Sequence, residues 1–582
     1  MSRARGPLVL ASLAGAIAAV VCACTAPASG QDAGAIITLS IVATNDLHGG
    51  ILERDGRGGV ALFGGYVNNL RAARAADGGV LLVDAGDMFQ GTVESNLGEG
   101  AAVVAAYNAL GYHAAAIGNH EFDFGVVGPG VASRGSTADL RGALKARAAE
   151  AHFPFLAANL IDTGTGRPVE WPNVRRSTIA DVAGLRVGIV GVMTLRALSA
   201  TMATTTGGLR VDPIAPAILA EARALRQQGA DVVVAAAHAG GRCTRFDDPR
   251  DLSPCDLSRA EIGAVVRELP RGTVEVIASG HTHAGMAHEI DGTIVMQAFS
   301  KGLAFSRADL SIDRRTKQVT VRQVFPPRDI CARVYEGTAR CDPAAGGRRL
   351  VAAEYEGRPV EPDPAIARAI APAVERARAH WREPIGVTLE TPIRVAPIGT
   401  ESPLGNLFTD AMRAALPGVD IALNNTRGGL RADLPRGALT YGQLYETFPF
   451  DNQLVRLELT GAELARVFET QVREGRAPPG IAGVRVAASC AGGGLSLTMT
   501  LASGRTVRPG DRLSVVTTDF LATGGDRILT PVMPPGGFPL DESLPLVRDV
   551  VVDWLEDRGG RLRADQFIDN ARPRWNVGCG RN

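Results

Sequence analysis

Five short segments of the sequence concentrate side chains that can bind cations or transfer protons. Each segment follows a run of apolar residues. The candidate ligands in these segments are Asp46, His48, Asp87, Asn119, His238, His281 and His283. Carboxylate, amide and imidazole groups together suit divalent zinc, manganese, iron or cobalt, whereas calcium and magnesium prefer oxygen ligands alone. The residue types therefore predict a transition-metal site.

The number and spacing of these ligands favour two ions. Asp46 and His48 are two residues apart, as are His281 and His283. In extended backbone such pairs project to the same side. Seven candidates exceed the four positions around one tetrahedral ion. We therefore expect two divalent ions, with Asp87 bridging them.

The apolar runs have the length and composition of buried strands. They are rich in Val, Ile and Ala and occupy residues 36–43, 80–83, 114–117, 186–192, 232–237, 274–278 and 293–299. Continuous apolar runs are typical of strands buried on both faces. Helical patterns lie between them, so we expect an α/β domain with a largely parallel sheet or two facing sheets. Because the carboxyl ends of such strands face one crevice, the five segments can converge there.

A second α/β unit is expected after a connector. The length of 582 residues exceeds what one hydrophobic core normally supports. Residues 331–383 are rich in Gly, Pro and charge, except for a helical pattern at 364–381. A further helix is expected at 403–416, with strands at 420–423, 454–459 and 513–518. We expect a first domain at 36–330, a linker with a connector helix at 331–383, and a second domain at 384–579.

The order of the motifs, D-x-H, G-D, G-N-H-[DE], H and G-H-x-H, resembles the calcineurin-like metallophosphatases. The rest of the chain after the N-terminal leader resembles the bacterial 5′-nucleotidase family. This resemblance implies a layered first domain with two facing mixed sheets flanked by helices, and a second α/β domain that binds substrate. It also implies two ligand sets that share one residue: Asp46, His48, Asp87 and His283 for one ion, and Asp87, Asn119, His238 and His281 for the other.

Two residues between these ligands match the catalytic dyad of the family. Asp123 would hold His120 protonated and facing the substrate's phosphate. The two ions would supply a hydroxide for in-line displacement at phosphorus. His120 would stabilise the developing charge or protonate the leaving group, a role worth roughly 10²–10⁴ in rate. We expect Glu121 to turn away and to cap or brace the following helix.

Three segments of the second domain resemble the family's substrate-binding segments. They read ESPLGN at 401–406, FPFDN at 448–452 and FLATGGD at 520–526. The resemblance implies that Phe450 and Phe520 stack on the two faces of a nucleobase and that Asp526 accepts hydrogen bonds from ribose hydroxyls. Stacking of this kind contributes about 1–3 kcal/mol per base.

Other parts of the second domain depart from the family pattern. The segment NTRGGLR at 425–431 differs by one residue from N-x-G-G-x-R, so either Asn425 is displaced or Thr426 takes its place. Arg431 or Arg427 is expected to bind phosphate, because a guanidinium fork suits phosphate oxygens. Residues 396–402 lack an arginine that some relatives carry, and Arg527 and Ile528 replace a glycine and an aromatic residue. These departures leave the identity of the substrate open.

The leading hypothesis is an exported, metal-dependent phosphoric ester hydrolase that converts nucleoside monophosphates to nucleoside and phosphate. Three alternatives on the same architecture are a 2′,3′-cyclic nucleotide phosphodiesterase with 3′-nucleotidase activity, a UDP-sugar hydrolase and a thiosulfohydrolase. An alternative from another class is a surface nucleotide-binding protein without turnover, which the complete ligand set disfavours. The chain has 61 basic and 61 acidic residues. This balance does not indicate a nucleic-acid polymer as partner.

The N-terminus predicts export. A charged start, an apolar stretch at 8–21 and small residues are typical of a signal peptide, which we place at 1–23. VCAC at 21–24 resembles a lipobox, so we expect a lipid anchor at Cys24 and a location in the periplasm or cell envelope, with cleavage nearer Gly30 as the alternative. Six cysteines follow this region: Cys243, Cys255, Cys331, Cys341, Cys490 and Cys579. The first four form two close pairs that could each close a short loop by a disulfide, and the last two pair only by elimination.

Overall fold

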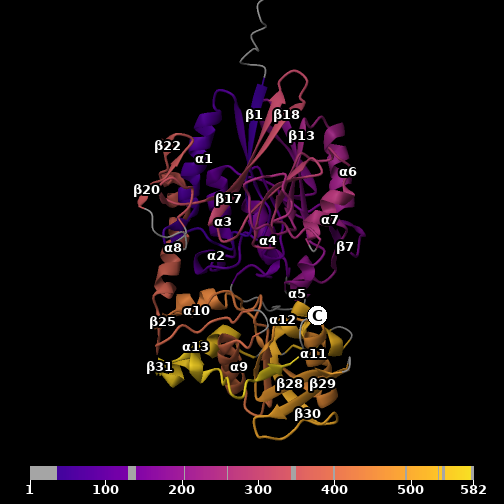
Figure 1. Ribbon diagram of the computed structural model, residues 1–582, viewed down its shortest axis with the longest axis vertical. Coiled ribbons are helices and arrows are strands. Elements are labelled where there is room, and N and C mark those ends of the chain that lie inside the picture. The colour runs from indigo at the N-terminus through magenta and orange to yellow at the C-terminus, as the bar shows by residue number, and fades with distance from the viewer. Residues whose placement is uncertain are drawn as a thin grey trace, which may run out of the picture.

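The computed structural model describes residues 36–128, 139–201, 203–258, 260–341, 349–397, 400–491, 494–534, 537–540 and 544–578. Two α/β domains are stacked along the long axis of the molecule and joined on one side by helix α8 (Pro364–Trp381) (Figure 1). The expected two-domain α/β fold is confirmed. The expected signal peptide and Cys24 lie outside the described residues.

Two facing mixed sheets form the centre of the first domain. The seven-stranded sheet contains, in spatial order, β18 (Val319–Asp329), β17 (Ala304–Asp313), β1 (Ile36–Thr44), β4 (Gly78–Asp84), β5 (Ala114–Ala116), β6 (Phe155–Leu156) and β9 (Val174–Arg175). The six-stranded sheet contains β10 (Ser177–Val182), β11 (Leu185–Met193), β13 (Val232–His238), β14 (Val276–Ser279), β16 (Thr293–Ala298) and β15 (Gly285–Ile290). Ile41 and Leu81 of one sheet share a buried cluster with Ile189 and Val234 of the other. Apolar residues on the inner faces thus hold the sheets together.

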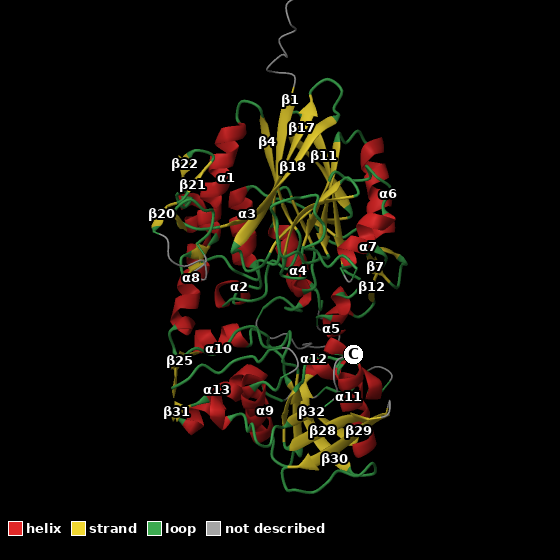
Figure 2. Cartoon of the chain, viewed as in Figure 1, coloured by secondary structure: helices red, strands yellow, loops and turns green. Residues whose placement is uncertain are grey.

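Helices cover the outer faces of both sheets (Figure 2). On the seven-stranded sheet they are α1 (Val60–Arg74), α3 (Ala101–Leu110) and α4 (Gly142–Glu150); on the six-stranded sheet they are α6 (Ile214–Gln227) and α7 (Glu261–Glu268). Strands covered on both sides are buried throughout, which explains their continuous apolar sequences. Short elements decorate this domain: α2 (Val93–Asn96), α5 (Ala203–Thr206), β2 (Glu53–Arg54), β3 (Arg57–Gly58), β7 (Leu160–Asp162), β8 (Arg167–Pro168) and β12 (Leu209–Val211).

The connector contains small hairpins and then helix α8. The hairpin strands are β19 (Arg333–Tyr335), β20 (Leu350–Ala352), β21 (Glu354–Tyr355) and β22 (Arg358–Pro359). Helix α8 begins after Asp363, whose side chain accepts hydrogen bonds from the backbone N–H groups of Ala365 and Ile366. This N-cap and a proline at the first position are a common helix start. The helix packs on α1, α2 and α3 and then reaches α10 (Tyr441–Thr447) of the second domain.

The second domain has three small sheets. Their strands are β25 (Gly437–Thr440), β23 (Pro384–Leu389) and β31 (Gly560–Leu562); β26 (Leu454–Thr460), β30 (Arg512–Thr518), β24 (Ile421–Asn424) and β27 (Gly480–Ala482); and β29 (Gly494–Leu501), β28 (Val484–Ala491) and β32 (Trp575–Val577). The helices packed on them are α9 (Pro403–Ala415), α11 (Gly461–Arg473), α12 (Asp519–Ala522) and α13 (Val547–Arg558). Of the segments quoted from this domain, 401–406 forms the start of α9, whereas 425–431, 448–452 and 520–526 lie beyond the ends of β24, α10 and β30.

Disulfides close two loops of the described chain. Cys243 is bonded to Cys255 and Cys331 to Cys341, as predicted. Cys490 is also disulfide-bonded, and Cys579 lies outside the described residues. Among the described helices, none combines the length and apolar character needed to cross a bilayer.

Candidate active site

The five predicted metal-binding segments meet at the carboxyl ends of strands from both sheets. Asp46 follows β1, Asp87 follows β4, Asn119 follows β5, and His281 follows β14, while His238 is the last residue of β13. The side chains form two groups, one of Asp46, His48 and His283 and one of Asp87, His238 and His281. Within each group the potential ligand atoms lie within 4.8 Å of one another.

Asp87 and Asn119 connect these groups. Asp87 Oδ2 is 3.1 Å from His238 Nε2 and 4.0 Å from His48 Nε2, so this carboxylate lies between the two groups. Asn119 Oδ1 is 3.1 Å from His238 Nε2 and thus adjoins the second group. The structure therefore brings all seven predicted ligands together.

Backbone carbonyl groups orient the buried imidazole rings. His48 Nδ1 is 2.8 Å from the carbonyl oxygen of Gln90, and His238 Nδ1 is 2.8 Å from that of Ala85. When Nδ1 donates to a carbonyl, Nε2 keeps its lone pair for a cation. His48 Nε2 faces His283 Nε2 at 2.9 Å, and two ring nitrogens at this separation suit a shared cation. The donor set and its orientation fit divalent transition metals.

Five of the seven predicted ligands have a backbone conformation that is rare for residues other than glycine. Their φ angles are 48° for Asp46 and His48, 59° for Asp87, 72° for His281 and 52° for His283. Such conformations cost free energy and persist where the surrounding structure enforces them, most often at functional sites. The strained backbone conformations of these five ligands therefore lie together at this crevice.

The neighbouring glycine of the G-N-H motif allows close packing of two ligand loops. A Cβ atom on Gly118 would lie 2.3 Å from Asp87 Oδ1 and 2.6 Å from the Asp87 backbone nitrogen. Only a residue without a side chain fits there.

His120 and Asp123 form a buried pair at the edge of the metal-ligand cluster. His120 Nδ1 is 2.6 Å from Asp123 Oδ2, and Thr201 Oγ1 donates to Asp123 Oδ1 at 2.7 Å. The backbone N–H of His120 donates to Asp87 Oδ1 at 2.9 Å. Burial disfavours the charged ring, but Asp123 and Asp87 outweigh this effect and raise the pKa of His120. The pair is therefore suited to hold a proton.

The expectation that Glu121 caps or braces the following helix is wrong. Its carboxylate accepts hydrogen bonds from the backbone N–H groups of Gly118 at 2.7 Å, Asp87 at 3.0 Å and Met88 at 2.6 Å. Residues 120–122 form a single 3₁₀ turn, and the next helix in the described residues, α4, begins only at Gly142. Glu121 instead joins the loops that carry Asp87 and Asn119. Burial raises the pKa of Glu121 to about 8.

Burial and neighbouring charges set the charge states of the histidine cluster. Burial, then the charge of Arg431, lowers the pKa of His48, and burial lowers that of His281 to about 4. Both rings are then neutral, which is the form that binds metals. At His238 the effect of burial is outweighed by Asp87, which raises the pKa to about 10. A cation at this position competes with that proton.

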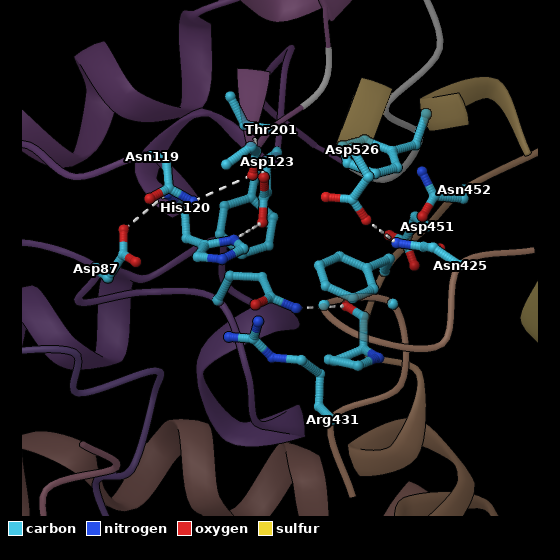
Figure 3. A pocket seen from close by; sticks show the side chains of 18 of the residues that line it. Asp87, Asn119, His120, Asp123, Thr201, Asn425, Arg431, Asp451, Asn452 and Asp526 are labelled. Atoms are coloured by element: carbon cyan, nitrogen blue, oxygen red, sulfur yellow. Dashed lines mark hydrogen bonds and ion pairs between the residues drawn. The ribbon is translucent and has the colours of Figure 1, made fainter. Parts of the chain in front are cut away.

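Residues of the second domain close a cavity of about 200 Å³ over this cluster. Figure 3 shows His120 and Asp123 on one side of it and Asn425 and Asp526 on the other. The predicted substrate residues that line it are Arg431, Asn425, Phe450, Phe520 and Asp526. Arg427, also predicted, lines an adjoining pocket instead.

Several contacts connect the two sides of the cavity. Arg431 Nη2 is 3.2 Å from His48 Nε2, and its guanidinium carbon is 5.9 Å from the centre of the Phe450 ring. The Phe450 ring lies 6.2 Å from that of His120. Within the side formed by the second domain, Asn425 Nδ2 donates to Asp526 Oδ2 at 2.5 Å.

Sequence reasoning missed four polar residues that line the cavity: Gln90, Thr201, Asp451 and Asn452. Gln90 Nε2 donates to the carbonyl oxygen of Pro449 at 3.3 Å, across the domain boundary. Gln90 and Asn452 lie within two or three residues of the predicted site residues Asp87 and Phe450. This closeness in sequence could have predicted that they line the cavity. Thr201 lies in a loop without a recognisable pattern.

Two sequence families match the two domains. The calcineurin-like phosphoesterase family matches residues 39–285, and the 5′-nucleotidase C-terminal domain matches residues 384–532. The chain belongs to the 5′-nucleotidase family. The predicted resemblance is confirmed, and with it a metal-dependent phosphoric ester hydrolase that uses divalent metal ions.

Curated relatives of this 5′-nucleotidase family member are distant in sequence. "5′-nucleotidase" of Vibrio cholerae is 26% identical, over 79% of this chain and 80% of that protein. "Protein UshA" of Yersinia enterocolitica is 24% identical, over 87% of each chain. "Endonuclease YhcR" of Bacillus subtilis is 26% identical over 85% of this chain, which spans only 38% of that longer protein.

A solved structure agrees in fold with this family member. The crystal structure of a 5′-nucleotidase precursor from Thermus thermophilus superposes with a TM-score of 0.68 at 23% identity, covering 93% of this chain and 99% of the other. At this identity the likeness concerns the fold alone.

Proposed function

We propose that this chain hydrolyses nucleoside 5′-monophosphates to nucleoside and phosphate with two divalent metal ions. The observation that carries this proposal is one cavity with two different walls. One wall holds four of the seven ligands, Asp87, Asn119, His281 and His283, with the His120–Asp123 pair, and the other holds Phe450, Phe520 and Asp526. A phosphate at the first wall and a nucleoside at the second fit one nucleotide.

We assign the ions to the two ligand groups. Asp46, His48, Asp87 and His283 would hold one ion, and Asp87, Asn119, His238 and His281 the other. Divalent ions in such a site supply Lewis-acid chemistry to phosphoester hydrolysis. The 3.1 Å and 4.0 Å separations of Asp87 from His238 and His48 support its place in both sets.

The protein's own groups would bind the nucleotide and move one proton. His120 would protonate the departing ribose oxygen, which its contact with Asp123 and its raised pKa support. Arg431 lies beside His48 and is placed to bind the phosphate oxygens. Phe450 and Phe520 would stack on the base, and Asp526, oriented by Asn425, would accept from the ribose hydroxyls.

The name of the Vibrio cholerae relative supports a monophosphate substrate. The test is hydrolysis by the purified chain with added manganese or zinc, using AMP, UDP-glucose, 2′,3′-cyclic AMP and an aryl phosphate. We expect the highest kcat/KM for AMP and about two bound transition-metal ions per chain. If kcat/KM were higher for UDP-glucose or for the cyclic nucleotide, that compound rather than AMP would be the preferred substrate. A metal-loaded chain without turnover would favour a binding protein.

We also propose that the chain is exported and anchored through Cys24. The disulfides Cys243–Cys255 and Cys331–Cys341 support an oxidising compartment. The mass of the mature N-terminus, isolated from the native host, distinguishes a lipidated Cys24 from cleavage nearer Gly30. An unprocessed Met1 would refute export by this route. We further propose, as a separate point, that the first domain ends at residue 330 and the second begins at residue 384.

A further inference from the structure

A second pocket of about 300 Å³ adjoins the nucleotide cavity. It shares His281, Asn425 and Asp526 with that cavity, but neither Phe450 nor Phe520 lines it. The pocket therefore opens from the side of the cavity near the metal ligands and Asp526, away from the aromatic rings. Four arginines contribute to its lining: Arg196, Arg427, Arg476 and Arg527.

The charge of this pocket is strongly positive. Among the described residues that line it, Asp526 is the only one with a carboxylate. Arg476 is already engaged, because its Nε donates to Glu474 at 2.6 Å and its Nη1 to the backbone oxygen of Asp526 at 2.7 Å. Arg196, Arg427 and Arg527 are exposed and form no ion pair with a carboxylate in the described part of the chain. Unpaired guanidinium groups around a concave surface attract anions, phosphate in particular.

The backbone between the two pockets is unusual. Asp526 and Arg527 are consecutive non-glycine residues with positive φ angles of 49° and 54°. Each such residue costs roughly 1–2 kcal/mol. The turn places Asp526 on the wall of both pockets and Arg527 on that of the second pocket alone. A strained turn that separates a carboxylate from a cation in this way points to a binding role.

We propose that this arginine pocket binds a second phosphate, attached to the ribose of a nucleotide whose 5′-phosphate faces the metal ligands. The inference rests on the proposed function, because it takes Asp526 as the residue that binds the ribose hydroxyls. A group attached to one of those hydroxyls passes Asp526 and enters the pocket. A terminal phosphate of a nucleoside 3′,5′-bisphosphate and the diester of a 5′-phosphorylated dinucleotide present the same anionic oxygens there.

The test compares four substrates: AMP, adenosine 3′,5′-bisphosphate, the dinucleotide pApA and ADP. Release of the terminal phosphate on the 5′ side, which is the β-phosphate of ADP, is measured for the wild type, Arg196→Gln, Arg527→Gln and the double variant. Arg485→Gln is the matched control, since Arg485 is exposed, lies in the second domain like Arg527, and is outside both pockets. A contact of an exposed arginine with phosphate is worth up to about 1 kcal/mol, or about fivefold in affinity.

We expect kcat/KM for the bisphosphate to exceed that for AMP in the wild type. Each single variant should reduce it about threefold to fivefold and the double variant about tenfold, while AMP and ADP change less than twofold. The reduction should shrink at high salt. If kcat/KM in the variants fell equally for AMP and the bisphosphate, or fell only for ADP, the placement of the second phosphate in the arginine pocket would be wrong. The arm with pApA decides whether a diester is accepted as well as a terminal phosphate.

Calorimetric titration of adenosine 3′,5′-bisphosphate separates this inference from the proposed function. If the wild type hydrolyses none of the substrates, the proposed function fails. Binding that weakens in Arg527→Gln but not in Arg485→Gln would still support the pocket. Binding that is equal in these two variants, or undetectable in the wild type, would overturn it.

Discussion

The two walls of the cavity are built in different ways. The wall from the first domain consists of side chains at the ends of adjacent strands, and Asp87 and Asn119 there are 2% and 1% exposed. The wall from the second domain consists of loops, where Phe450, Phe520 and Asp526 remain partly exposed. The first wall fixes ligands by the fold itself, and the second can change with loop sequence. A rigid chemical wall beside a wall of loops would let the substrate change without loss of the metal-binding residues.

Each wall also rests on a buried carboxyl group. Asp84, at the end of β4, accepts from Thr44 Oγ1 at 2.5 Å, Tyr107 OH at 2.8 Å and the backbone N–H of Gly86 at 2.8 Å. Asp519, at the start of α12, accepts from Asn452 Nδ2 at 2.8 Å and from its neighbour's backbone N–H at 2.7 Å. Asp84 thus supports the loop that carries Asp87, and Asp519 supports the segment that carries Phe520.

Replacing His120 by Ala should have the largest effect, greatest for AMP and smaller for an aryl phosphate, because a phenolate departs with less need of a proton than a ribose oxygen. Loss of the proton donor should reduce kcat about 10²–10⁴-fold, while the metal content stays that of the wild type. Turnover with AMP and with an aryl phosphate, together with elemental analysis, checks this. His152→Ala, an exposed histidine of the same domain, is the control. Wild-type turnover in His120→Ala would remove the proposed dyad.

Replacing Phe520 by Ala should have a smaller effect that depends on the substrate. Loss of about 1–3 kcal/mol of stacking should raise KM for AMP roughly 5–150-fold. Hydrolysis of ribose 5-phosphate, which lacks a base, should change less than twofold. Phe520→Trp keeps an aromatic face and should restore the KM for AMP to near that of the wild type. If both substrates were affected equally, the two walls would not be separable as proposed.

The same difference between walls governs what the sequence predicts. Strand ends could be located because apolar runs and polar clusters alternate, and the helix at 364–381 begins and ends where its proline and tryptophan indicate. The position of Glu121 could not be predicted, because its partners at 87 and 88 belong to another loop. The arginine pocket also eluded prediction, since Arg196 and Arg527 come from different domains.

The last expected effect concerns stability rather than turnover and compares the two buried carboxyl groups directly. Burial raises the pKa of Asp84 from 3.8 to about 7 and that of Asp519 to about 6. Between the unfolded and folded pKa values, the folded state holds a proton that the unfolded state has lost. Stability therefore falls as pH rises through this interval and is constant above it. Asparagine cannot ionise, so each Asp→Asn variant lacks the fall in stability that the replaced carboxyl group causes in the wild type.

The unfolding free energy of Asp84→Asn minus that of the wild type should thus increase from about pH 4 to pH 7. Its total is at most about 4 kcal/mol, given 1.36 kcal/mol per pKa unit. For Asp519→Asn the gain should end near pH 6 and be smaller. Thermal unfolding at pH 5, 6, 7 and 8 measures both, and any constant offset from the amide cancels between pH values. A difference for Asp84→Asn that does not change with pH would mean that this carboxyl group is ionised in the folded protein, and the contrast between the two walls would not extend to the groups beneath them.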